Sequence, residues 1–233
     1  FAHGGGAEEL MLFTLAYGLY SVTNAMHQNR LLTFWESFLN GLFAAMVLLI
    51  KFTAMGFYIG LVLFVIFWYL SRNGQWKPLL ATAGQFILGA GAIILPVLLY
   101  FGIHHAIDDL FTVYFYNNLF LYPQETDGTR LELIIRCLQS TLSYNDSYAP
   151  WIYLGAALFA LELRTHWRDA VMVLLSFVGL AAGTYWGGRG YTYYGLILAG
   201  FAVYGIIAIA RLLQVGRFTE VLQRFLRKTP WVP

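Results

Sequence analysis

LLATAGQFILGAGAIILPVLLYF, residues 79–101, has no charged side chain anywhere along its length. About 20 predominantly apolar residues in a helix are enough to cross the hydrocarbon core of a bilayer. The stretch therefore predicts a membrane-spanning helix. Pro96 lies inside it, and we expect this proline to kink the helix rather than end it, because neighbouring helices can satisfy the freed carbonyl.

The composition of the whole chain is that of a membrane protein. Hydrophobic residues make up 59% of the 233 residues, aromatic residues 18% and charged residues only 11%. A soluble domain carries about a quarter charged residues, so this chain has too few of them to cover a surface in water. The net charge of +2 indicates no nucleic-acid partner, and the single cysteine, Cys137, excludes an internal disulfide or a cysteine metal cluster.

The apolar runs between polar breaks predict an all-α fold, a polytopic transmembrane bundle of about seven helices. The second and third runs are separated only by Lys51 and its neighbours, so a tight turn at the membrane surface should connect them. The fifth run is short for a bilayer. The predicted spans lie near 9–26, 33–50, 53–70, 79–101, 151–163, 170–186 and 192–213.

The basic residues predict the orientation, because short cytoplasmic loops carry an excess of Lys and Arg. Alternate numbering of the connections places ten of the 14 basic residues on one side, together with the C-terminus. That side is predicted to be cytoplasmic, and the N-terminus then lies outside. Residues 1–213 form the transmembrane domain, with an outer-face loop at 102–150, and residues 214–233 form a basic amphipathic tail on the anionic inner leaflet. The outer side keeps only Lys51, Arg130, Arg136 and Arg189.

Two carboxylates open the first predicted helix on the outer side, in HGGGAEE at residues 3–9. Glu8 and Glu9 are consistent with simple capping, since acidic groups near a helix N-terminus are stabilised by the helix dipole. The alternative is that they line an outer cavity, where a carboxylate orients a hydroxyl or binds a cation.

Lys51 ends an apolar run, in LLIKFTAMG, at the predicted outer surface. Its side chain either snorkels to the outer headgroups with no further purpose or points inward and pairs with an anionic group, as ionisable residues near membrane interiors often do. The sequence leaves both interpretations open.

Arg189 lies between glycines in GGRGYTYY, residues 187–194. Glycines leave room for a ligand, and a guanidinium presents a rigid fork of donors matched to phosphate oxygens. Tyr191, Tyr193 and Tyr194 add hydroxyls and ring faces at the interface. The alternative is an ordinary positively charged loop with an aromatic belt.

The long outer segment 102–150 opens with two histidines and two aspartates, His104, His105, Asp108 and Asp109. The spacing could place a histidine and an aspartate one helical turn apart, but the pattern fixes no third ligand. The sequence therefore predicts no metal-ligating residue, although a divalent cation is compatible with it. These residues are more typical of the start of an interfacial helix, and the continuation YFYNNLFLYP is typical of a surface that lies on lipid and touches sugar.

Taken in order, four stretches resemble the GT-C superfamily of polytopic glycosyltransferases, and within it the bacterial relatives of protein mannosyltransferases and aminoarabinose transferases. They are GGGAEE before the first span, GLFAAMVLLIKFTA at 41–54, the Asn-containing outer stretch and GGRGYTYY before the final span. The resemblance covers most of the chain. It implies an inverting enzyme of the bacterial plasma membrane that moves a sugar from a polyprenyl-phosphate donor to a glycan, lipid or protein acceptor on the extracytoplasmic face.

The resemblance also implies roles for particular residues. By position, Arg189 and Lys51 would bind the donor phosphate. The catalytic Asp or Glu of such enzymes is expected in a first outer loop upstream of Phe1, so the chain looks like the C-terminal portion of one. The sugar or acceptor site would be lined by Glu8, Glu9, Tyr191 and Tyr194.

Two other functions stay open at this point. One is a transporter or flippase of lipid-linked sugars, although such proteins tend to show inverted repeats and charges near the membrane midplane, and the sequence shows neither. The other is a non-catalytic accessory subunit whose outer surface only binds, because the expected base is missing from the chain.

Overall fold

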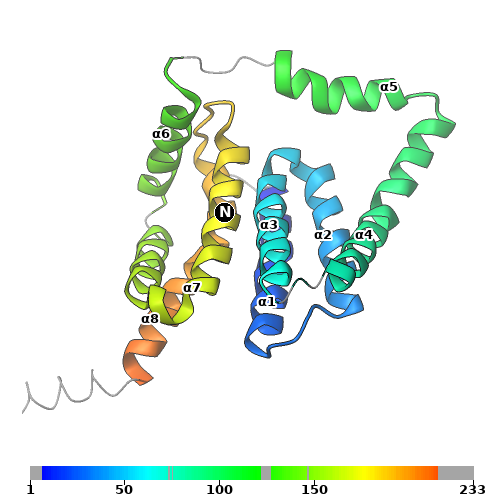
Figure 1. Cartoon of the computed structure of the whole chain (residues 1–233). Coiled ribbons are helices and arrows are strands. Elements are labelled where there is room, and N and C mark those ends of the chain that lie inside the picture. Colours follow the sequence, from blue (N-terminus) through cyan, green and yellow to red (C-terminus); the bar gives the residue numbers. More distant parts are fainter. Residues whose placement is uncertain (1–6, 73, 75, 122–126, 146, 215–233) are drawn as a thin grey trace, which may run out of the picture.

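A computed structural model describes residues 7–72, 74, 76–121, 127–145 and 147–214, and every regular element in these residues is helical (Figure 1). In chain order the elements are α1 (Ala7–His27), α2 (Phe34–Lys51), the 3-10 turn η1 (Phe52–Met55), α3 (Gly56–Leu70), α4 (Trp76–Ile103), α5 (Ile107–Asp109), the π-helix η2 (Leu110–Leu121), α6 (Arg130–Ser143), α7 (Ala149–Tyr185), the 3-10 helix η3 (Thr192–Ala202) and α8 (Val203–Gln214). The predicted all-α class is confirmed.

Each predicted span lies in helical structure, but the divisions differ. The fifth and sixth predicted spans belong to one element, α7, and the last begins as the 3-10 helix η3 before it becomes α8. Pro96 lies inside α4, which continues to Ile103, so the proline does not end the helix. The predicted tail at 214–233 lies outside the described residues except for its first position.

Three helical stretches of the described chain are long and apolar enough to cross a membrane: Phe34–Leu70, Trp76–Ile103 and Trp167–Tyr185. The first of them contains α2, η1 and α3, and the chain reverses direction at η1, at the place where the sequence predicts a tight turn (Figure 1). A larger number of crossings, and the orientation of the bundle, stay predictions.

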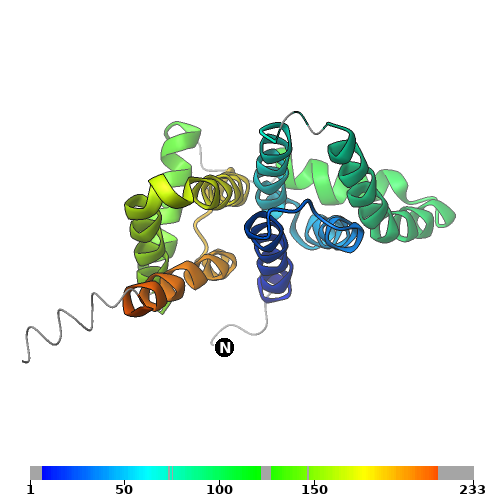
Figure 2. The ribbon, with the colours of Figure 1, turned by 60° about the horizontal axis from the view of Figure 1, so that its bottom comes forward.

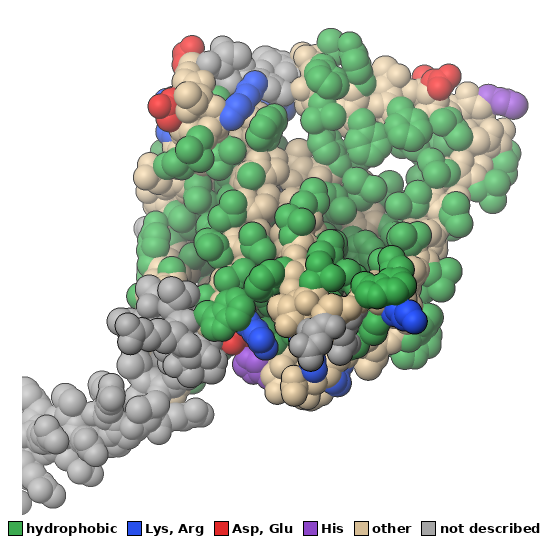
Figure 3. Space-filling view, viewed as in Figure 1, with side chains coloured by type: hydrophobic (Ala, Val, Ile, Leu, Met, Phe, Trp, Pro, Cys, Tyr) green, Lys and Arg blue, Asp and Glu red, His purple; other side chains and the backbone are tan. Residues whose placement is uncertain are grey.

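The surface has the distribution of side chains expected for a bundle in a bilayer. Charged side chains gather at the two ends of the molecule, and a broad apolar band lies between them (Figure 3). Helix α4 has only Gly89 buried, and side chains such as Ile87 and Leu95 are 69% and 65% exposed. Such an apolar and exposed helix is stable only where lipid or another apolar surface covers it.

Figures 1 and 2 show two groups of helices, α1–α4 and α6–α8, that meet where α3 lies beside α7. Glycines permit this contact, because a Cβ added at Gly60 would collide with the carbonyl oxygen of Leu175, and one at Gly179 would collide with that of Gly56. Small residues spaced four apart let two membrane helices approach backbone to backbone. The α3–α7 contact is therefore the main contact between the two halves, which α1 also joins through η3.

At the opposite end of the bundle from Lys51, polar contacts involve the connection between α1 and α2 and the residues beside it. Thr33 and Glu36 form a capping box that starts α2. The same Glu36 carboxylate accepts two hydrogen bonds from Arg30, at 2.6 and 2.7 Å. A second pair joins His27 to Asp169 at 2.9 Å and connects α1 to α7.

Candidate functional site

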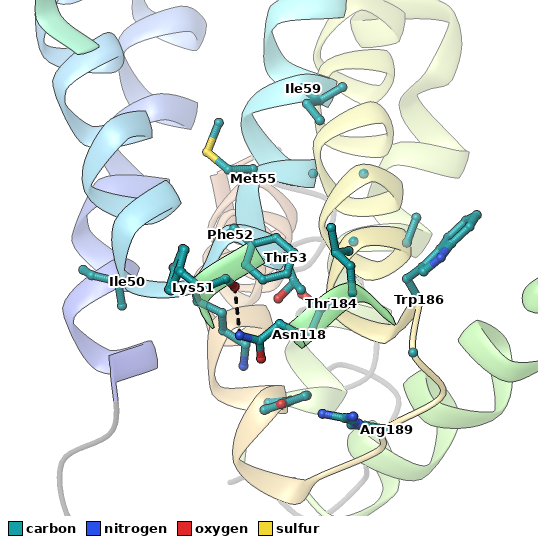
Figure 4. Close-up of a pocket in the computed structure, with 18 residues that line it drawn as sticks. Ile50, Lys51, Phe52, Thr53, Met55, Ile59, Asn118, Thr184, Trp186 and Arg189 are labelled. Carbon is teal, nitrogen blue, oxygen red and sulfur yellow. Dashed lines mark hydrogen bonds between the residues drawn. The ribbon is translucent and has the colours of Figure 1, made fainter. Parts of the chain in front are cut away.

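A pocket of about 610 Å³ lies at one end of the contact between α3 and α7 (Figure 4). Its walls come from the end of α2 through η1 to α3, from the π-helix η2, and from the C-terminal end of α7 with the loop that follows. These segments are far apart in the sequence, so the pocket exists only in the folded chain. It is lined by residues of 50–59, 114–119 and 179–189, and by Tyr194.

The pocket follows from the helix crossing beneath it. Gly56, Gly179 and Gly183 line its inner part, where the backbones of α3 and α7 are in direct contact. Beyond this crossing, η1 replaces α-helix on one side and α7 ends on the other. Glycines leave no side chains to fill the space between the diverging segments, and a cavity results.

Lys51 and Arg189, the two predicted phosphate-binding residues, both line this pocket. Helix α2 ends at Lys51, whose backbone leaves the helical region with φ −156° and ψ 89°. Arg189 is half-buried and follows the turn that ends α7. Figure 4 shows Arg189 toward one end of the pocket, Ile59 toward the other, and Lys51 between them. The structure therefore brings the two cations into one site.

A glycine directs the Arg189 loop toward the pocket. Gly188 has φ 71°, a conformation that residues with a Cβ rarely adopt, and its N–H donates to the carbonyl of Tyr185 at 2.9 Å. This left-handed turn ends α7 and reverses the chain at once. Gly188 therefore forms the backbone turn after α7, in addition to leaving space for a ligand.

Tyr194 lies directly against Lys51. The Lys51 Nζ is 3.2 Å from the centroid of the Tyr194 ring and 5.8 Å from that of Tyr193, a cation–π arrangement. Tyr191 contacts both of the other rings, with centroids 5.6 Å from Tyr193 and 5.2 Å from Tyr194, but it is 49% exposed and does not line the pocket. Of the two predicted tyrosines, only Tyr194 is part of the wall.

Glu9, one of the two predicted carboxylates, is not brought into the pocket. Tyr17 packs on Phe43, whereas Ser21, one turn later in α1, accepts a hydrogen bond from Asn40, which lies earlier in α2. Helix α1 therefore runs antiparallel to α2, which places Glu9 at the same end of the bundle as Lys51. Glu9 nevertheless does not line the pocket. Glu8 lies in the first turn of α1, and its side chain lies outside the described part of the chain. Among the described lining residues there is no Asp or Glu.

The structure adds lining residues that sequence patterns did not single out. Asn118 donates from Nδ2 to the carbonyl of Tyr114 at 2.8 Å, and the Tyr114 hydroxyl donates to the carbonyl of Leu48 at 2.7 Å. Burial raises the pKa of the Tyr114 hydroxyl, so this group stays a neutral donor. The Asn-rich composition of the stretch was the available signal, but only the fold shows which asparagine faces the pocket.

Two threonines also line the pocket, Thr53 beside Lys51 and Thr184 near the end of α7. Neither was identified from the sequence, because a threonine at a helix end has many ordinary roles. The atom Oγ1 of each is buried and has no hydrogen-bond partner among the described residues.

The predicted spacing of His104 and His105 before Asp108 and Asp109 does not produce helical neighbours. Helix α4 ends at Ile103, and α5 begins only at Ile107. His105 has φ 54°, so the chain turns between the two pairs instead of continuing as one helix. In the described residues no group of three His, Cys, Asp or Glu side chains is placed to hold a metal ion.

The position of residues 107–121 is consistent with the interfacial helix that the sequence predicts after His104 and His105. The elements α5 and η2 lie across the end of the bundle, roughly perpendicular to the neighbouring helices (Figure 1). Phe111 and Phe120 of η2 are more than half exposed, whereas Tyr114 and Phe115 pack on Phe52 with ring centroids 5.7 and 5.6 Å away. One side of the segment covers the pocket and another presents aromatic rings outward.

Comparison of the chain with protein-family models, with curated proteins and with solved structures finds no match. The geometry of the pocket therefore carries the functional argument.

Proposed function

We propose that the chain is part of a multi-pass membrane glycosyltransferase of the bacterial plasma membrane, and that its pocket binds the polyprenyl-phosphate-linked sugar donor. The acceptor would be a glycan, lipid or protein on the extracytoplasmic face. One observation carries the proposal: Lys51 and Arg189, from opposite halves of the bundle, line one pocket whose walls also include the apolar side chains of Met55 and Ile59.

The two ends of the pocket suit the two parts of such a donor. At one end an ammonium and a guanidinium supply charge-assisted donors to a phosphate. Toward the other end the walls are Met55, Gly56 and Ile59, and Ile59 is 59% exposed on the apolar surface of α3. A prenyl chain can enter from the lipid at this side while the phosphate reaches the cations.

The proposed transfer needs a group that the described pocket does not contain. A bond forms between the acceptor oxygen and the anomeric carbon, and the bond from that carbon to the phosphate oxygen breaks. The lipid phosphate leaves with the electron pair, and a carboxylate accepts the hydroxyl proton. Arg189 and Lys51 would stabilise the growing charge on the phosphate, whereas the carboxylate must come from outside the described lining. Glu8, Glu9 and Tyr191 remain candidates for the acceptor side.

The absence of a carboxylate among the described lining residues favours a second candidate, a subunit that binds lipid phosphate without catalysis. The two candidates differ in one result. The intact protein, incubated with polyprenyl-phosphate sugar and membrane acceptors, should release polyprenyl phosphate if it is the transferase. Binding of the donor without release of polyprenyl phosphate would assign the accessory role.

Replacement of Lys51 tests the binding proposal. Lys51→Met keeps the length of the side chain but removes its charge, and a hydrogen bond to a charged group contributes about 1.5–3 kcal/mol. Affinity for polyprenyl phosphate should fall at least tenfold, while affinity for uncharged polyprenol should stay the same, measured by isothermal titration in detergent. Lys77→Met, at the exposed start of α4, is the matched control and should change neither. Equal losses for both lipids would contradict a phosphate-binding role.

The proposed orientation, with the N-terminus outside and the C-terminus in the cytoplasm, has its own test. Asp109 and Lys77 are exposed at opposite ends of α4 and its extension. In a Cys137→Ser background, Asp109→Cys should react with an impermeant maleimide in intact cells, and Lys77→Cys only after permeabilisation. The reverse pattern would place the pocket mouth in the cytoplasm.

A further inference from the structure

The middle of the pocket contains two buried hydroxyl groups that the fold itself does not use. Thr184 is 6% exposed, and its Oγ1, like that of Thr53, has no hydrogen-bond partner in the described part of the chain. Both residues line the pocket. A buried polar group without a partner is costly and calls for an explanation, such as a water, an ion or a ligand that supplies the bond.

The two threonines come from different halves of the bundle and are held close together. A Cβ on Gly183 would collide with the carbonyl oxygen of Thr53, so the backbone of η1 lies directly on the last turns of α7 at the residue before Thr184. Figure 4 shows Thr53 and Thr184 near each other, between Phe52 and Trp186. Thr53 and Thr184 therefore belong to the close contact between η1 and α7 and not to an exposed loop.

Their position divides the pocket into two chemical parts. Lys51 and Arg189 lie beyond the threonines toward the loop, and Gly56 and Ile59 lie on the other side along α3. A phosphate ester of a long alcohol has a charged phosphate group at one end and a hydrocarbon chain at the other. The boundary between the two parts lies at the phosphate. Neutral hydroxyl groups at this boundary can donate hydrogen bonds to phosphate oxygens that the two cations do not contact.

We infer that Thr53 and Thr184 are binding residues that donate hydrogen bonds to the phosphate oxygens of an alkyl phosphate, and thereby hold that phosphate inside the pocket rather than at its mouth. The inference rests on the proposed function and makes it more specific. The sugar of a donor would then lie on the side of Tyr194, outside the level of the threonines, where the tyrosine rings are.

The test uses Thr53→Val, Thr184→Val and the double variant of the full chain in detergent, titrated with dodecyl phosphate. Valine keeps the shape of threonine and removes only the hydroxyl. Each single variant should bind about tenfold more weakly, because a hydrogen bond to a charged acceptor is lost, and the double variant should lose more than either. Thr53→Ser and Thr184→Ser retain a hydroxyl and should stay within about threefold of wild type.

Stability separates this role from a structural one. Since neither hydroxyl has a partner in the described residues, the valine variants without ligand should melt at or above the wild-type temperature. Thr14→Val is the matched control: Thr14 is buried away from the pocket and donates to the carbonyl of Met11 at 2.7 Å. That variant should bind dodecyl phosphate like wild type.

Inorganic phosphate and dodecanol complete the experiment. Dodecyl phosphate should bind the wild type more tightly than either, and valine should weaken the phosphate ester but not dodecanol. If wild type binds dodecyl phosphate and the valine variants bind it equally well, the threonine inference is wrong while the lipid-phosphate function stands. If wild type does not bind dodecyl phosphate or polyprenyl phosphate, the proposed function fails. An equal loss for dodecanol would assign the threonines to an alcohol oxygen and overturn the inference.

Discussion

Arg189→Ala is expected to weaken binding of the polyprenyl-phosphate donor by about 10- to 150-fold. The estimate corresponds to about 1.5–3 kcal/mol for a hydrogen bond to a charged group, because alanine removes every donor that the guanidinium presents to the phosphate. Arg189→Lys keeps the charge but not the fork of donors, so it should recover only part of the affinity. Affinity is measured by titration of the intact protein in detergent.

The control for Arg189 is another arginine at the same end of the bundle. Arg136 is exposed on α6 and does not line the pocket. Arg136→Ala lowers the net charge by the same amount, so any general attraction of the protein surface for anionic lipid should fall equally in both variants. If the two variants lose the same affinity, the phosphate contact at Arg189 is refuted and only surface charge is involved.

Gly60→Ala is expected to destabilise the fold by about 1–3 kcal/mol or more, the usual cost of adding a group to a close-packed contact. A Cβ at this position would collide with the backbone carbonyl of Leu175, which cannot rotate away as a side chain can. Helices α3 and α7 would have to separate, and the two halves of the bundle would lose their main contact. Thermal unfolding in detergent, followed by circular dichroism, measures the effect.

Gly84→Ala is the matched control on α4. Apart from the neighbouring residues and backbone of its own helix, nothing lies within 4 Å of the Cβ that alanine would add there, and alanine is the better helix former by about 1 kcal/mol. This variant should melt at or slightly above the wild-type temperature. Equal unfolding temperatures for Gly60→Ala and Gly84→Ala would show that the α3–α7 contact is not close in solution.

Gly60 does not line the pocket, so the same variant also tests how the pocket is made. If the crossing of α3 and α7 sets the distance between the two cations, Gly60→Ala should weaken donor binding without changing any residue that touches the donor. Retained affinity in a destabilised variant would mean that the pocket walls do not depend on the crossing.

Local rules predicted where most of the helical structure lies, but not that the fifth and sixth predicted spans form one element, α7. The apolar runs belong to helical structure, and Thr33 forms a capping box with Glu36, three residues later, at the start of α2. The turn at Lys51 and the continuation of α4 through Pro96 also agree with the prediction. Each of these depends on hydropathy or backbone preference within a few residues, and the sequence contains that information directly.

Spacing along the chain does not by itself give proximity in space. His104 and Asp108 are four residues apart, but a left-handed residue at His105 separates the helices that contain them. Glu9 is at the predicted end of the bundle, yet its helix places it away from the pocket lining.

The sequence by itself determined that this is an all-helical, strongly apolar chain with cations at Lys51 and Arg189. Only the tertiary structure decided that these cations share a pocket, and that Thr53 and Thr184 lie beside them. The physical reason is that the glycine contact between α3 and α7 joins residues more than a hundred positions apart. No periodicity within either helix specifies which glycines will meet, because that is set by the packing of both surfaces together.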